Sequence, residues 1–96
     1  MITIIARMTA KDGQFDAMRA LAMELSRAVA ENEPDNALYA ICEGAEPNQL
    51  ILVERYKDEA SIEAHRGSDH LRTIGKKIGA TLAFRHEVLF RLTDCA

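Results

Sequence analysis

The sequence predicts an α+β protein with a ferredoxin-like, split βαβ arrangement, in which helices cover one face of an antiparallel sheet. Short apolar, β-branched runs alternate with segments of helical spacing. Their order is β-α-β-β-α-α-β, which is typical of the split βαβ unit. No repeat or linker interrupts residues 1–96, so we expect a single domain.

The first half of the chain is predicted to contain a strand, a helix and a second strand. Residues 2–8 are rich in β-branched side chains, and Asp12 in the turn that follows is placed to cap a helix. Over residues 14–32 the apolar residues recur at helical spacing and form one stripe. Pro34 ends this helix because it disfavours the α conformation in the residue before it. Residues 37–43 form the second strand.

Two short helices are predicted in the second half. Asp58 is placed to cap the first, over residues 59–66. Ser68 or Asp69 caps the next, which continues to Ile78 and is stopped by Gly79, because glycine commonly ends helices. These helices complete the cover of one sheet face.

The two remaining strands are apolar on both faces. Residues 50–56 begin with "LILV". In the last strand, residues 82–92, apolar side chains are predicted on both faces. One face carries Leu82, Phe84, Val88, Phe90 and Leu92, and the other carries Ala83 and Leu89. Since the helices cover only one face, we expect a second copy of the chain to cover the other in a homodimer.

Composition excludes several classes of protein. A net charge of -3 without a basic stripe argues against nucleic acid as a partner. No segment is apolar enough for a signal peptide or membrane span, and the two cysteines have no metal-ligand spacing, so a cytoplasmic protein is expected. With no ligand cluster and no glycine-rich phosphate loop, we expect no metal, flavin or haem cofactor.

Titratable side chains gather after the third strand. Strand alternation places Glu54 and Tyr56 on the same face and Arg55 on the other. His65 follows Ile62 by one helical turn and should point inward. His70 lies in the first turn of the next helix, whose positive end disfavours imidazolium. A neutral imidazole, a carboxylate and a phenol together suit proton transfer on a small organic acid.

A structural interpretation of each residue stays open. His65 could be a packed core histidine, and His70 an exposed residue at a helix start. Glu54 could pair with Arg55 at the surface, and Tyr56 could be a core aromatic. The isolated His86 of the last strand is equally consistent with a structural role.

The motifs resemble those of the antibiotic biosynthesis monooxygenase family. "LVERYKDEASIEAHRGSDH" is similar to the family's V-E-R-W, D-x-x-A and H-x-x-S-x-H, with Tyr56 in place of the usual tryptophan and Ser61 where an alanine is common. "EPDNALYAI" resembles E-P-G-C-L-x-Y-x-L, with Glu33 and Tyr39 at matching positions. The similarity extends over residues 1–92.

This resemblance implies a dimeric α+β barrel and oxidation of a quinol or phenolic compound by O2 without a cofactor. His65 or His70 would be the base, with Tyr56 and Glu54 orienting the substrate. An oxyanion would be held by Arg55 or Arg72. Further substrate-binding candidates are Tyr39 and His86.

The same residues are also consistent with two other functions. Some relatives process a phosphorylated autoinducer-2 breakdown product, so the alternatives are an isomerase or lyase and a dimeric module that only binds a small hydrophobic ligand. The absence of tryptophan argues against the haem-degrading relatives.

Overall fold

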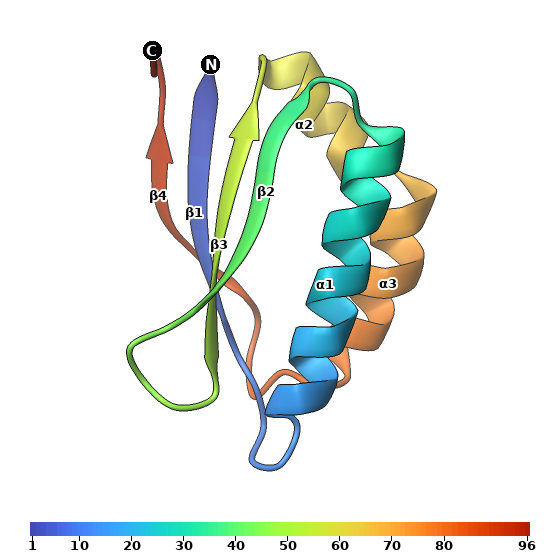
Figure 1. Cartoon of the computed structure of the whole chain (residues 1–96), viewed down its shortest axis with the longest axis vertical. Coiled ribbons are helices and arrows are strands. Elements are labelled where there is room, and N and C mark those ends of the chain that lie inside the picture. The colour runs from blue at the N-terminus through green and yellow to red at the C-terminus, as the bar shows by residue number, and fades with distance from the viewer.

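The computed structural model describes residues 1–96 as a four-stranded antiparallel sheet with helices on one face (Figure 1). The strand order is β2-β3-β1-β4, which confirms the predicted ferredoxin-like arrangement. The elements are β1 (Ile2–Thr9), α1 (Phe15–Asn32), β2 (Asn36–Glu43), β3 (Gln49–Tyr56), α2 (Glu59–Arg66), α3 (Asp69–Gly79) and β4 (Glu87–Leu92).

Strict alternation in β1 and β3 builds the face of the sheet that meets the helices. In both central strands every second residue is buried, and Ile4 lies opposite Glu54 in the register. Since side chains of a strand alternate between faces, Glu54 and Tyr56 point to the helix side, as predicted.

The helix α1 packs its apolar stripe onto this face, beside α3 (Figure 1). Its buried residues are Met18, Ala22, Leu25 and Val29. Burial of a large aliphatic side chain contributes about 1.5–3 kcal/mol, so this stripe anchors the helix layer. A second, smaller cluster lies under α2 and contains Ile2, Ile4, Tyr56 and Ile62.

Side-chain caps define both short helices. Asp58 and Ser61 form a reciprocal capping box at α2, and the Ser68 hydroxyl accepts from the Leu71 N–H at α3. The predicted cap by Asp12 is wrong. Its carboxylate instead accepts a hydrogen bond from Asn48 Nδ2 at 3.2 Å, and α1 begins without a side-chain cap.

The last strand is shorter than predicted, and the alternation of its side chains between the two faces is interrupted. Leu82 makes only an isolated bridge to Ala10, and β4 begins at Glu87. A bulge shifts the register, so that Phe90 lies opposite Ile5 but Val88 lies opposite Ala6. Val88 is thereby turned toward the helices, while Phe90 remains on the open face with Ile5.

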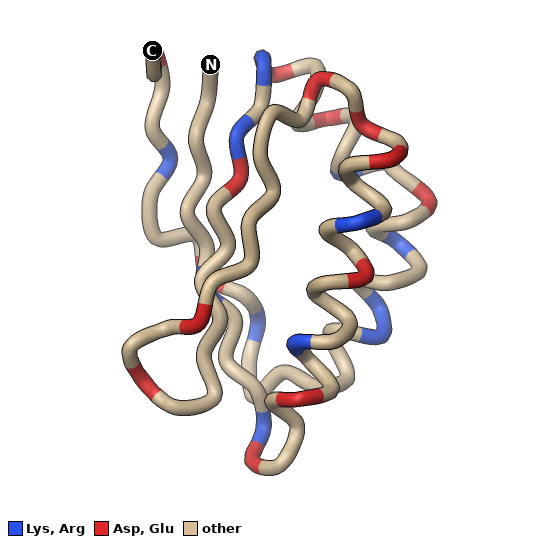
Figure 2. The backbone as a smooth tube through the Cα atoms, viewed as in Figure 1, with Lys and Arg blue, Asp and Glu red and all other residues tan.

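The open face of the sheet carries exposed apolar side chains in the single chain, beside the charged Arg7, Glu87 and Arg55. Phe90 is 59% exposed and Leu92 46% exposed, and both share this face with half-buried residues of β1 and β3. Charged residues of both signs lie on the helices, turns and strand ends, and several acidic residues gather where the end of α1 meets α2 (Figure 2). None of the helices has the length and hydropathy that crossing a membrane requires.

Candidate active site

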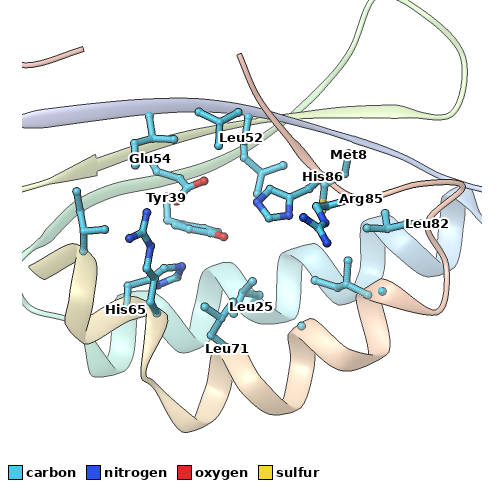
Figure 3. A pocket seen from close by; sticks show the side chains of 18 of the residues that line it. Met8, Leu25, Tyr39, Leu52, Glu54, His65, Leu71, Leu82, Arg85 and His86 are labelled. Atoms are coloured by element: carbon cyan, nitrogen blue, oxygen red, sulfur yellow. The ribbon is translucent and has the colours of Figure 1, made fainter. Parts of the chain in front are cut away.

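A cavity of about 670 Å³ lies between the sheet and the helices (Figure 3). Of the 20 residues that line it, 13 are hydrophobic. This volume falls in the range of small-molecule sites, which are mostly apolar with a few placed polar groups. The cavity therefore suits a small organic molecule whose polar atoms meet specific side chains.

Four side chains form what we call the polar cluster of the cavity: Tyr39, Glu54, Tyr56 and His65. Tyr39 of β2 lies opposite Glu54 of β3 in the register, so both face the helices. His65 is buried on the same side of α2 as Ile62. Its ring centroid lies 5.4 Å from that of Tyr39 and 5.6 Å from that of Tyr56.

Glu54 and Tyr56 form a buried hydrogen-bonded pair. The Tyr56 hydroxyl donates to Glu54 Oε1 at 2.5 Å. Burial raises the pKa of Glu54 above its ordinary value, although the bond from Tyr56 and the nearby His65 and His86 oppose this effect. Burial also raises the pKa of the Tyr39 and Tyr56 phenols. Burial thus disfavours the charged form of all three groups.

His65 is held from behind by Glu33, the residue that follows α1. His65 Nδ1 lies 2.9 Å from Glu33 Oε2, and both side chains are almost fully buried. An ionised carboxylate only accepts hydrogen bonds, so the proton of a neutral His65 belongs on Nδ1. Its Nε2 makes no hydrogen bond to the protein and is free to accept a proton on the cavity side.

His70 bonds the same carboxylate without reaching the cavity. Its Nε2 makes a short contact with Glu33 Oε2, and His70 is not among the lining residues. Burial alone would raise the pKa of Glu33, but the hydrogen bonds from His70 and His65 outweigh it and lower that pKa below its ordinary value. Of the two histidines that the sequence analysis left open, only His65 faces the cavity.

The sequence analysis missed Glu33 as a site residue and the cluster that it forms. The donor atoms of Glu33, His65 and His70 lie within 4.8 Å of one another, which is close enough for metal ligation. This corrects the expectation that no ligand cluster exists. In the structure, however, imidazole N–H groups already occupy both carboxylate oxygens. The matching Glu33 of the "EPDN" motif was the available signal.

The predicted arginines do not reach the cavity. Arg55 lies on the open sheet face and donates to the Ala96 carbonyl, and Arg72 pairs with Asp69 at the surface. His86 does line the cavity, but from the loop before β4 and not from a strand. The neighbouring Arg85, which the sequence analysis did not select, lines it as well.

Comparisons with known proteins agree on one family. The family model described as antibiotic biosynthesis monooxygenase matches residues 1–77. A protein named "Putative monooxygenase Rv0793" from Mycobacterium tuberculosis is 28% identical over 81 residues, covering 84% of this chain and 79% of that protein. Its solved structure superposes with a TM-score of 0.87 at 26% identity, covering 99% of this chain and 95% of the other.

Two further solved structures show the same fold at lower identity. A "Putative antibiotic biosynthesis monooxygenase" from Nitrosomonas europaea has a TM-score of 0.90 at 20% identity and covers 100% of both chains. A protein of the same description from Caulobacter crescentus has a TM-score of 0.92 at 20% identity, covering 99% of this chain and 90% of its own.

Proposed function

This chain belongs to the antibiotic biosynthesis monooxygenase family, and we propose that it oxidises a small phenol or hydroquinone with O2 without a metal, flavin or haem. Names of relatives support a monooxygenase at the level of the family. The observation that carries the finer proposal is the buried His65–Glu33 pair, whose free imidazole nitrogen opens onto an apolar cavity.

The first step is removal of a proton from the substrate hydroxyl by His65 Nε2. Glu33 holds the imidazole in the required tautomer and stabilises the imidazolium that forms. The phenolate is electron-rich and can transfer an electron to O2 directly. The apolar walls keep water from the reactive species.

The overall reaction balances without an external reductant. A hydroquinone and O2 give a hydroxyquinone and water: one oxygen atom enters the ring and the other leaves as water. Both sets of electrons come from the substrate, through oxidation of the ring hydroxyls and of one C–H bond. The Tyr39 hydroxyl, whose proton makes no hydrogen bond within the protein, is placed to donate one to the developing oxyanion.

An oxygen electrode tests this proposal. Metal-depleted protein is incubated with a panel of hydroquinones, and isotopically labelled O2 is followed into the product. We expect His65→Ala to lower turnover about 10²-fold, the usual contribution of a positioned base. His70→Ala should lower it less, because His70 does not face the cavity. Full turnover by His65→Ala on a genuine substrate would contradict the proposal.

The alternative of an enolising isomerase has one observation in its favour. A base at His65 and a buried carboxyl at Glu54 in one cavity could remove a proton from one carbon and return it to another. Such a reaction would proceed in the absence of O2. Turnover under strictly anaerobic conditions would therefore favour the isomerase over the monooxygenase.

We further propose that the protein acts as a homodimer through the open face of its sheet. Phe90, Leu92 and Leu38 are each more than two-fifths exposed on this face, and Ile5 and Val53 are half-buried between them. A second copy would remove this apolar surface from water. An apolar patch shared by several strands is uncommon on a monomer.

A further inference from the structure

The loop between α3 and β4 brings two basic side chains to the cavity. Arg85 and His86 both line it, and Figure 3 shows Arg85 at the end away from His65, with His86 between Arg85 and Glu54. Between these two ends the lining is formed by apolar side chains such as Leu25 and Leu52. The cavity therefore has polar groups at both ends, and two arginines line it: Arg85, and Arg66 beside His65, which is paired with Glu63.

Arg85 differs from the other arginines in its surroundings. Five of the chain's arginines form ion pairs with carboxylates: Arg7, Arg19, Arg66, Arg72 and Arg91. Arg55 donates to a backbone carbonyl. Arg27 and Arg85 have no protein partner, and of these only Arg85 faces the cavity. Its guanidinium thus presents unused donors to whatever occupies the cavity.

The cavity offers Arg85 no anion of its own. Glu54 is the only carboxylate in its lining, and that carboxyl is already engaged by the Tyr56 hydroxyl at the other end. The nearby Glu87 is held by Arg7 at 2.8 Å. A guanidinium with five donors and no partner, beside an imidazole, is suited to a carboxylate or phosphate.

We propose that the substrate carries an anionic group, a carboxylate or a phosphate, which Arg85 and His86 bind while its reacting hydroxyl meets His65. This inference rests on the proposed function for the role of His65. The aromatic ring then lies against the apolar middle of the cavity. Binding of the anion orients the hydroxyl toward Nε2 and disfavours uncharged phenols of similar shape.

Anaerobic calorimetry tests the binding site without requiring turnover. The probes are a hydroquinone with an acetate side chain, the matching amide, and a hydroquinone with a phosphomonoester side chain. We expect at least one of the charged probes to bind about 10-fold tighter than the amide, the usual effect of a charge-assisted hydrogen bond. Whichever charged probe binds tighter identifies the anion as carboxylate or phosphate.

Two variants test whether Arg85 causes the preference for charged probes. Arg85→Gln should abolish the difference between charged and uncharged probes, while Arg27→Gln, which removes the same charge from an exposed site on α1, should keep it. Equal binding of charged and uncharged probes by the wild-type protein would overturn the proposal, and so would equal effects of the two variants.

The same probes separate this inference from the monooxygenase proposal. If the charged probes bind through Arg85 but no substrate consumes O2, the anion site stands and the monooxygenase fails. If O2 is consumed equally with charged and uncharged hydroquinones of equal affinity, the monooxygenase stands and the anion site fails.

Discussion

His65 and Glu33 meet across the junction of α1 and α2, with Nδ1 of the imidazole 2.9 Å from Oε2 of the carboxylate. Both side chains are withdrawn from solvent, at 7% and 8% exposure. His65 lines the cavity and Glu33 does not, so the carboxylate acts on a ligand only through the imidazole.

Removing the charge of Glu33 should make His65 a weaker base while a side chain of the same size stays in place. In Glu33→Gln the amide no longer stabilises an imidazolium, so turnover should fall about 10²-fold. Glu31→Gln is the matched control, because Glu31 lies two residues earlier, near the end of α1, is exposed, and forms no side-chain hydrogen bond or ion pair. Initial rates of O2 consumption measure the effect. If both variants retain the wild-type rate, Glu33 does not position the base.

Acid should destabilise the wild-type protein through Glu33. Its pKa is lowered in the folded state, so its stabilising contribution is complete above the unfolded pKa of about 4.3. The contribution is lost as the pH falls through the lower, folded pKa. Urea denaturation between about pH 2 and pH 7 should therefore show a steeper acid loss for wild-type than for Glu33→Gln. Parallel pH profiles would contradict this linkage.

Glu54 should show the opposite dependence, because burial raises its pKa in the folded state. Stability is then complete below the unfolded pKa and decreases as the pH rises through the folded value. Glu54→Gln imitates the protonated acid and can still accept from Tyr56, so it should fold and lose less stability than wild-type as the pH rises above the unfolded pKa of about 4.3. Glu46→Gln, in the exposed turn before β3, is the control. A destabilised Glu54→Gln at neutral pH would show that the ionised form is needed.

The homodimer proposal is tested on the open face. Phe90→Asp places a charge where Phe90 is 59% exposed in the single chain, so it should produce a folded monomer. Ala30→Asp adds the same charge on the exposed side of α1 and should leave the dimer intact. Sedimentation velocity at micromolar concentration distinguishes the two. A wild-type protein that sediments as a monomer would refute the dimer directly.

Chelation should leave the protein unchanged. Glu33, His65 and His70 could hold an ion, but hydrogen bonds between them already satisfy the carboxylate oxygens. We therefore expect the same melting temperature and turnover before and after treatment with a chelator. A stoichiometric metal by elemental analysis, together with a lower melting temperature after its removal, would assign these residues to a metal site instead.

Local periodicity was enough to predict the directions of several site residues. Alternation along β3 places Glu54 and Tyr56 on the helix side, and the spacing of Ile62 and His65 turns the imidazole inward. Asp58 and Ser68 identified the starts of α2 and α3. These features depend only on the geometry of a single element, which the order of its own residues determines.

Only the tertiary structure decided which distant groups meet. Glu33 lies 32 residues before His65, and the packing of α2 against the end of α1 joins them. The bulge in β4 turns Val88 away from the face of Phe90, because register depends on pairing with β1. Arg85 reaches the cavity since the loop after α3 folds back over it. Periodicity determines the direction of a side chain within one element. Which distant residue it contacts depends on how separate elements pack against one another.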